Sequence, residues 1–264
     1  MTTPTRTDPG PLLVARGVKK SFGHVEALRG ADLTVHEREV VAVVGDNGAG
    51  KSTFISCISG ALLPDEGEVT LAGEPLELGS IKAAMRSGIA AVYQDLAVAP
   101  HLSVAENVYL STELRRPGLL GKLGVLDRRA MRDQSRALMS SLGIDLRDGN
   151  VPVEDLSGGQ RQVVAVARAV SRASRLVIMD EPTAALGARQ SQIVLDTIQA
   201  TRERGLSVIL VSHDLPRVLQ VADRIVVMRL GRVAAEVSPQ GMTVSRIVAL
   251  MLGEQTQAEE RIPS

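Results

Sequence analysis

The chain is poor in aromatic residues, in cysteine and in net charge, and each shortage narrows what it can be. Aromatic residues make up 2% of its 264 residues, and there is no Trp. The one cysteine, Cys57, excludes an internal disulfide and suits a reducing compartment. Basic and acidic residues balance at 30 each, so the chain has no overall positive charge with which to attract nucleic acid.

Long apolar runs are also missing from the sequence, and no signal peptide is expected. No run approaches the roughly 18 apolar residues that span a bilayer, and the first residues, MTTPTRTDPGP, lack the apolar core of a signal peptide. The four histidines show no metal-ligand spacing. We therefore expect any work at a membrane to be done through a partner. The 44% hydrophobic content is ample for an α/β core.

A phosphate-binding pattern lies between a predicted strand and a predicted helix. The apolar run Val40–Val44 predicts a buried parallel strand, and a helix is expected from Lys51 to near Gly60. Between them the sequence matches G-x-x-x-x-G-K-[ST] in the context that defines a P-loop. The loop and helix start read Gly45, Asp46, Asn47, Gly48, Ala49, Gly50, Lys51, Ser52 and Thr53.

This loop has the residues needed to hold nucleotide phosphates. Its glycines let the backbone turn its N–H groups inward, and the helix N-terminus adds partial positive charge. We expect Lys51 to reach the β- and γ-phosphates, Ser52 to ligate Mg²⁺ and Thr53 to contact the α-phosphate side. The motif alone predicts only a nucleoside triphosphate, because kinases and GTPases share it.

Two acidic residues follow a second apolar strand, predicted over residues 175–179. Ligands of parallel α/β sheets lie at the carboxyl ends of the strands. Asp180 is therefore predicted to hold Mg²⁺, directly or through water. Glu181 comes next and can orient or deprotonate an attacking water.

A second candidate anion site follows Leu156. Ser157, Gly158, Gly159 and Gln160 precede a strong helical pattern over residues 161–172. Small residues at a helix start expose N–H groups that can bind an anion. Since one γ-phosphate does not require two sites in one chain, we expect this site to serve the ATP of a neighbouring subunit.

In this order the motifs resemble the ATP-binding subunits of ABC transporters, over about residues 12–240. The resemblance implies ATP and Mg²⁺ as cofactors and ATP hydrolysis coupled to transport. It also implies an α/β fold, a P-loop NTPase core with an antiparallel β-subdomain and an inserted helical subdomain. The helical subdomain is expected over about residues 95–170, after a flexible tail (1–11), with a short C-terminal helix and tail in residues 241–264.

Three further residues take roles from this resemblance. Gln94 matches the glutamine that senses Mg²⁺ and the γ-phosphate and touches the membrane partner. His213, after the predicted strand 207–211, matches the histidine that contacts the γ-phosphate. Phe22 stands at the spacing of the aromatic residue that stacks on adenine, although an ordinary half-buried Phe is the alternative.

Two positions depart from the commonest family pattern. Gly187 stands where many members have an aspartate, and Val163 where many have Arg or Lys. With the segments VYQDLA and MDEPTAALG, these departures resemble the single-domain ATPases of monosaccharide importers of the ribose and fructose type. No role is assigned to Gly187, and communication between subunits is expected to differ from the general scheme.

The remaining pattern predicts the order of elements around these motifs. Residues 12–35 alternate as in an antiparallel β-section, and helices are expected over 103–114 and 127–144. Residues 119–124 indicate a glycine-broken connection between those helices. Parallel α/β structure is expected to resume from 175 to about 237, with a last short helix over 243–252.

The resemblance also implies partners and leaves alternatives. It implies a head-to-tail homodimer, integral-membrane permease subunits, an extracytoplasmic binding protein and a place on the cytoplasmic face of the membrane, with no nucleic acid. An ATPase serving an exporter or another importer type stays open. More remote are soluble ABC ATPases of DNA maintenance or translation, because the chain has neither sustained heptads nor an internal repeat. The sequence names no cargo.

Overall fold

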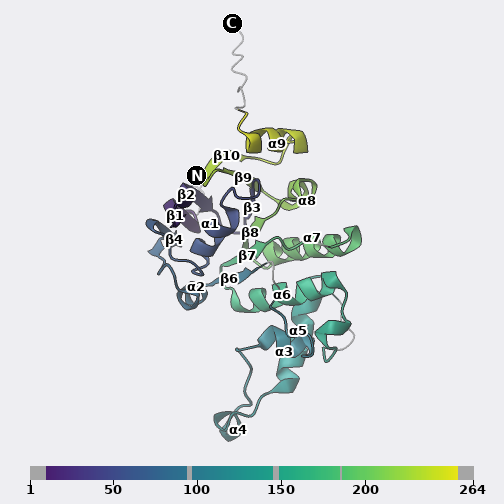
Figure 1. Cartoon of the computed structure of the whole chain (residues 1–264). Helices are drawn as coiled ribbons and strands as arrows, with labels where there is room; N and C mark the ends of the chain where they lie inside the picture. Colours follow the sequence, from purple (N-terminus) through teal and green to yellow (C-terminus); the bar gives the residue numbers. More distant parts are fainter. Residues whose placement is uncertain (1–9, 94–96, 145–148, 185, 255–264) are drawn as a thin grey trace, which may run out of the picture.

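Two β-sheets and a set of helices make up the described chain (Figure 1). The computed structural model describes residues 10–93, 97–144, 149–184 and 186–254. The strands are β1 (Leu13–Phe22), β2 (Val25–Val35), β3 (Val40–Val44), β4 (Glu66–Leu71), β5 (Glu74–Pro75), β6 (Ile89–Val92), β7 (Leu176–Asp180), β8 (Ser207–Val211), β9 (Arg224–Arg229) and β10 (Arg232–Val237). The helices are α1 (Lys51–Ile58), α2 (Ile81–Ser87), α3 (Val104–Tyr109), α4 (Leu119–Lys122), α5 (Arg128–Ser141), α6 (Gly158–Arg172), α7 (Ala188–Glu203), α8 (Leu215–Val221) and α9 (Val244–Leu252), with a 3₁₀ turn at Val153–Asp155.

The first sheet is antiparallel, in the order β2-β1-β4-β5. The β1–β2 hairpin at one edge of this sheet pairs Leu13 with Val35 and Phe22 with Val25. This confirms the antiparallel β-section expected over residues 12–35. The first residues of β2, Val25, Glu26 and Ala27, lie beside the phosphate-binding loop that follows β3.

The second sheet carries the strands that end in candidate site residues, in the order β10-β9-β3-β8-β7-β6. Strands β9, β3, β8, β7 and β6 are mutually parallel. The expectation of parallel structure to about 237 is wrong for β10, which pairs antiparallel with β9. Only the tight turn at Leu230 and Gly231, both with positive φ, separates β9 from β10, and such a turn reverses the chain.

Strand register aligns the carboxyl ends of the central strands. Val211 of β8 lies opposite Val43 of β3 on one side and opposite Asp180 of β7 on the other. In a parallel sheet these ends meet at the same edge, where ligands of α/β proteins bind. The loops that leave this edge begin at Gly45, Glu181 and Ser212.

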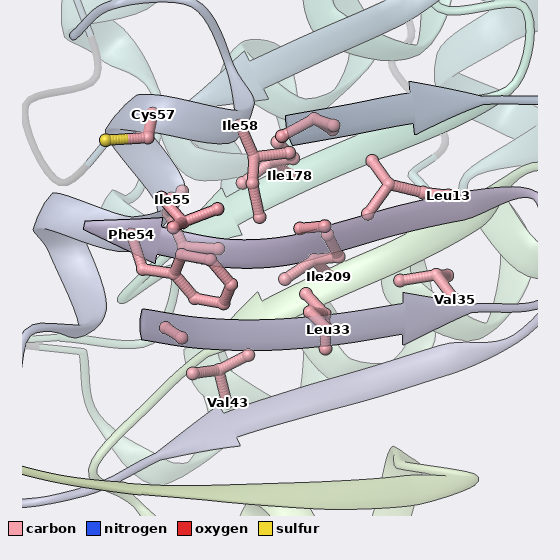
Figure 2. Close-up of a cluster of buried hydrophobic side chains, with 14 of the residues drawn as sticks. Leu13, Leu33, Val35, Val43, Phe54, Ile55, Cys57, Ile58, Ile178 and Ile209 are labelled. Carbon is pink, nitrogen blue, oxygen red and sulfur yellow. The ribbon is translucent and has the colours of Figure 1, made fainter. Parts of the chain in front are cut away.

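Helix α1 is packed between the two sheets (Figure 2). Phe54, Ile55 and Ile58 are fully buried there, with Leu13 and Leu33 of the first sheet and with Ile178 and Ile209 of the second (Figure 2). Cys57 is buried in the same cluster, and desolvation raises the pKa of its thiol to about 11. This thiol therefore stays protonated and packs as an apolar group.

The other face of the second sheet is covered by helices α6, α7, α8 and α9. Alternate residues of the same strands serve the two faces: Ile178 faces α1, while Val177 and Met179 face the helices. Such strands are buried on both sides and read as continuous apolar runs. A third cluster joins α3, α5 and α6 into a helical lobe beside the sheet (Figure 1).

The helical lobe corrects two sequence expectations. Helix α3 ends at Tyr109, short of the expected residue 114, and Ser111 takes a positive φ of 68°. Residues 119–124 were expected to form only a connection, but Leu119–Lys122 is helical. Gly121 permits this turn, since a Cβ there would stand 1.9 Å from the carbonyl oxygen of Arg116. The expected last helix is confirmed as α9.

Among the described helices, none has the length and apolar character that crossing a membrane requires.

The two phenylalanines of the chain provide a matched test of the core between the sheets. Phe54→Ala is expected to lower the free energy of unfolding by about 3–5 kcal/mol, because it leaves a cavity beside α1. Phe22→Ala should change it by less than about 0.5 kcal/mol, since Phe22 is half exposed at a hairpin end. Urea titrations followed by circular dichroism measure both values. Equal losses would contradict the proposed packing.

Candidate nucleotide site

The phosphate-binding loop can close only because glycine occupies two of its positions. Gly45 follows β3 with a φ of +155°, and a Cβ there would stand 2.3 Å from the carbonyl oxygen of Met228. Gly50 has a φ of +100°, and its Cβ would stand 2.6 Å from the carbonyl oxygen of Ala27. The loop therefore packs backbone to backbone against β9 and the hairpin tip, with no room for a side chain.

Lys51 begins α1 and extends back across the loop. Its ammonium Nζ donates hydrogen bonds to the carbonyl oxygens of Gly45, at 2.7 Å, and Asp46, at 3.0 Å. The side chain is buried. An ammonium group has three N–H donors, so one is left for an anion held by the loop.

A cavity of about 370 Å³ opens beside this loop. It is lined by residues 25–27 of the hairpin, by most of the loop from Asn47 to Thr53, and by Glu181. Asp46 and Ala49 instead line a cavity of about 280 Å³ on the other side of the loop, with Met251 of α9. Asn47 and Gly48 border both cavities.

Asp180 ends β7 as a buried carboxylate. Its Oδ1 has no hydrogen-bond partner among the described residues. Burial, followed by the charge of Glu181, raises the pKa of Asp180, whereas a hydrogen bond from the Ser52 hydroxyl and the charge of Lys51 act in the opposite direction. A buried acceptor without a donor is costly, and it is the kind of group that a cation satisfies.

The residues around Asp180 fit a magnesium ion. Oxygen ligands suit this hard cation, and Asp180 and Ser52 together present a carboxylate and a hydroxyl. Within the described ranges no group of three or more His, Cys, Asp or Glu side chains could hold a metal by itself. Mg²⁺ commonly needs only one or two protein ligands when substrate phosphates supply the others.

Glu181 and His213 form a pair at the ends of neighbouring strands. Nδ1 of His213 lies 2.8 Å from Oε2 of Glu181, with the glutamate mostly buried and the histidine 67% exposed. The backbone N–H of Glu181 donates to the carbonyl oxygen of Val211. Its φ of +51° is uncommon for a residue with a side chain, and such conformations concentrate at functional sites.

Gly158, Gly159 and Gln160 of the second candidate anion site form the first turn of α6 instead of preceding it, which corrects the expected helix start at residue 161. Ser157 is the N-cap: its Oγ accepts from the N–H of Gln160, and Gln160 Oε1 accepts from the N–H of Ser157. A Cβ on Gly159 would stand 3.0 Å from both Cβ and the carbonyl oxygen of Gln190 in α7. Helix geometry leaves the first N–H groups, those of Gly158 and Gly159, without acceptors inside α6.

Several predicted site residues, among them Asp180, His213 and Phe22, do not line this cavity. Phe22 lies at the end of β1 with 51% of its surface exposed, and it is absent from the cavity lining. Its ring lies 5.9 Å from Nζ of Lys20. Gln94 falls outside the described residues. The residue before it, Tyr93, is placed, and its hydroxyl hydrogen-bonds with Ser59 Oγ at 2.8 Å.

Sequence reasoning missed two features of this site. Val25, Glu26 and Ala27 line the cavity although they belong to the other sheet. Glu181 and His213 were predicted one by one, but their direct contact was not. The signal for that contact was available, since both residues follow apolar strands, but it depends on knowing that β7 and β8 are neighbours.

Comparisons with known proteins match this chain to members of one family. A family model described as "ABC transporter" matches residues 28–184. The chain is 50% identical over 254 residues to the fructose import ATP-binding protein FrcA of Rhizobium meliloti, covering 96% of this chain and 98% of that protein. It is 40% identical to the xylose/arabinose import ATP-binding protein XylG of Sulfolobus acidocaldarius, covering 95% of this chain and 99% of that protein.

Other relatives are longer, and solved structures share the fold. The chain is 39% identical to the ribose import ATP-binding protein RbsA 2 of Burkholderia pseudomallei but spans only 48% of its length. The ADP conformation of MJ1267, an ATP-binding cassette of an ABC transporter, superposes with a TM-score of 0.77 at 23% identity, covering 92% of this chain and 96% of that one. A dimeric cassette, MJ0796 bound to ADP and Pi, gives a TM-score of 0.70 at 27% identity, covering 87% of this chain and 100% of that one.

Replacing the buried carboxylate should stabilise the chain without nucleotide. The pKa of Asp180 is raised on folding, so its protonated form contributes stability below the unfolded pKa of about 3.9, and this contribution is lost as the pH rises through the folded pKa. Asp180→Asn, which cannot ionise, should therefore unfold at a higher temperature than the wild type at pH 7 and at nearly the same temperature near pH 3. Differential scanning calorimetry at both pH values measures this.

The matched control is Asp196→Asn on the exposed side of α7, which should change stability by no more than about 0.5 kcal/mol at pH 7. An Asp180→Asn chain that is less stable than wild type at pH 7 would show that the carboxylate is satisfied by the protein itself.

Proposed function

The chain belongs to the ABC transporter family as an ATP-binding subunit, and we propose that it hydrolyses ATP to drive import of a monosaccharide. The observation that carries the proposal is the meeting of three elements, α1, β7 and β8, at one sheet edge. Lys51 and Ser52 begin α1, Asp180 ends β7 and Glu181 follows it, and His213 lies just after β8. They surround or adjoin a cavity of about 370 Å³.

Each of these residues has a role that its position supports. The loop N–H groups and Lys51 bind the β- and γ-phosphates. Ser52 and Asp180 would hold Mg²⁺, which neutralises charge on the phosphate oxygens, and Gln94 is assigned to the same ion from its sequence position. Phe22 is proposed to reach adenine only when bound nucleotide draws the hairpin toward the cavity.

Hydrolysis follows as an in-line displacement at the γ-phosphorus. Glu181 orients a water and accepts its proton as the water oxygen bonds to phosphorus and the bond to the β–γ bridging oxygen breaks. ADP and inorganic phosphate leave. Oε2 of Glu181 is buried without a hydrogen-bond partner among the described residues, so the carboxylate is available to accept a proton, and His213 lies 2.8 Å from it.

A second copy completes the site in this proposal. The N–H groups at the start of α6 are on a different part of the chain from the cavity lining. In a head-to-tail pair, Ser157, Gly158, Gly159 and Gln160 of one copy face the γ-phosphate held by the other. Gly187, where many relatives have an aspartate, is the N-cap of α7, and its N–H donates to Gln190 Oε1 at 3.2 Å.

A groove next to Tyr93 is proposed as the contact for membrane permease subunits. Its volume is about 360 Å³, and α2, β6 and α6 line it. Ile81 at its rim is half exposed, while Arg168 and Arg172 border it from α6. The permease is proposed to bind here, on the cytoplasmic face of the membrane, because Tyr93, the residue before Gln94 in the sequence, lines this groove.

Import of a monosaccharide is preferred over import of another cargo because relatives that match this chain over nearly their whole length are named as fructose and xylose/arabinose import ATP-binding proteins. An ATPase of another importer or of an exporter is the alternative. The extracytoplasmic binding protein and the permease would select the sugar. The proposed boundaries of the ATPase unit are residues 12–240.

The first test is uptake in a deletion strain supplied with labelled pentoses and hexoses. Wild type should restore uptake of one sugar, and Glu181→Gln should not. Purified Glu181→Gln should bind ATP normally but hydrolyse it about 100-fold more slowly or worse, since the base is lost. Glu203→Gln, on the exposed last turn of α7, is the matched control and should behave as wild type. Normal entry of every sugar in the deletion strain would refute sugar import.

The second test concerns the pair of copies. Ser157→Arg should disable the site of the neighbouring copy, so an equal mixture with wild type should retain about one quarter of wild-type hydrolysis if both sites of a pair are needed. Phosphate release at fixed total protein measures this. If each copy hydrolyses ATP alone, the equal mixture should retain about one half of wild-type hydrolysis, and this result would contradict the proposed pair.

A further inference from the structure

The helical lobe carries an apolar projection that none of the roles above uses. Residues 114–127, called here the tip segment, leave the lobe after α3 and return to it at α5. Figure 1 shows α4 at the end of the lobe farthest from the sheets. Four of its apolar side chains are exposed: Leu119, Leu120, Leu123 and Val125.

The tip segment is held together by backbone hydrogen bonds. Its two ends are joined by the hydrogen bonds Asp127 N–H to Leu114 carbonyl, at 2.7 Å, and Arg116 N–H to Val125 carbonyl, at 2.9 Å. At its centre the N–H of Val125 donates to the carbonyl of Leu120. The backbone therefore holds α4 in place while its leucines point outward.

The exposure of these leucines is unusual for side chains in ordered structure. Leu119 is 74% exposed and Leu123 is 72% exposed, and they lie one helical turn apart. A cluster of apolar side chains held in contact with water marks an interaction site rather than a chance surface. On the helical lobe the apolar cluster of α3, α5 and α6 is complete without them.

Basic residues surround the leucines although the whole chain has a net charge of +0. The tip segment contains Arg115, Arg116 and Lys122 against one acid, Asp127, whose Oδ1 is occupied by the N–H of Ala130. Within the part of the chain that the structure describes, no salt bridge involves Arg116 or Lys122. Leucines flanked by cations on a short helix form the pattern of a segment that lies in a membrane interface.

The position of the tip segment agrees with its composition. Leu110 and Ser111, just before it, line the groove assigned above to the permease, and Arg172 of α6 donates to the carbonyl of Leu110. The projection therefore starts at the rim of the surface that would meet the membrane partner. The assignment of this groove to the permease rests on the proposed function, whereas the exposure of the leucines and the charge of the tip segment do not depend on it.

We propose that the tip segment binds the surface of a bilayer containing anionic lipids. Leu119, Leu120 and Leu123 enter the headgroup region, and Arg116 and Lys122 pair with lipid phosphates. The contact would hold the ATPase at the membrane beside its permease and orient the groove toward it. A protein contact is the competing explanation, and it fits less well because the exposed leucines lie beside Arg116 and Lys122 on a projection and line none of the described pockets.

Vesicle flotation of the full chain tests this directly. Vesicles of phosphatidylcholine with phosphatidylglycerol should carry wild type, and vesicles of phosphatidylcholine alone should not. Replacing both Leu119→Ser and Leu123→Ser should weaken binding by about tenfold or more, because two apolar insertions are lost. Raising salt should weaken wild-type binding, since the Debye length shortens. The double control Leu63→Ser and Leu252→Ser removes two leucines that are each 60% exposed elsewhere, and it should bind as wild type.

A second readout uses the absence of tryptophan from the chain. In the Leu120→Trp variant the only indole sits on the tip segment, and its emission should shift to the blue on anionic vesicles but not on neutral ones. Wild type that stays off anionic vesicles, or equal binding by the tip variant and the control, would overturn the proposal. Binding that needs permease in the vesicles would assign the segment to a protein contact. ATP hydrolysis by the same samples separates these results from failure of the proposed function.

Discussion

The parallel register of β3, β8 and β7 is the constraint on which the rest of this structure depends. Val211 stands between Val43 and Asp180, so the phosphate loop, the acidic pair and His213 leave the sheet at one edge. A slip of one residue would turn every side chain of a strand to the opposite face. The alternation of Ile178 toward α1 with Val177 and Met179 toward the helices makes such a slip expensive. The core thus fixes the site.

The site contains several features that lower the stability of the fold and whose cost a bound nucleotide with magnesium would reduce. Asp180 is a buried carboxylate with an unsatisfied oxygen, and Glu181 holds a φ of +51° beside it. Lys51 directs its ammonium to loop carbonyls. A ligand that binds only the folded chain returns stability by mass action. The same arrangement therefore explains both the local cost in folding free energy and the proposed use of the site. Phosphate would supply the negative charge beside Lys51, and magnesium would supply the positive charge beside Asp180.

The sequence was most informative where a pattern is local. The apolar runs at 40–44 and 207–211 and the glycine spacing of the loop each follow from a few adjacent residues, and the structure confirms those strands and the helix after the loop. Features that depend on distant partners were not accessible. The helix at Leu119–Lys122 requires the approach of Gly121 to Arg116, and the Glu181–His213 contact requires that β7 and β8 be neighbours. Phe22 was expected on adenine from spacing alone, and spacing does not determine whether a hairpin end faces inward.

The central claim is that this sheet edge holds a nucleotide together with magnesium, and the most direct measurement is a calorimetric titration of the chain with ATP, with and without Mg²⁺. Mg²⁺ is expected to tighten ATP binding to wild type, and Asp180→Asn should remove most of this effect while ATP alone still binds through the loop and Lys51. Equal tightening of ATP binding by Mg²⁺ in wild type and in Asp180→Asn would contradict a magnesium site at Asp180, because the ion would then be held without the carboxylate at the end of β7.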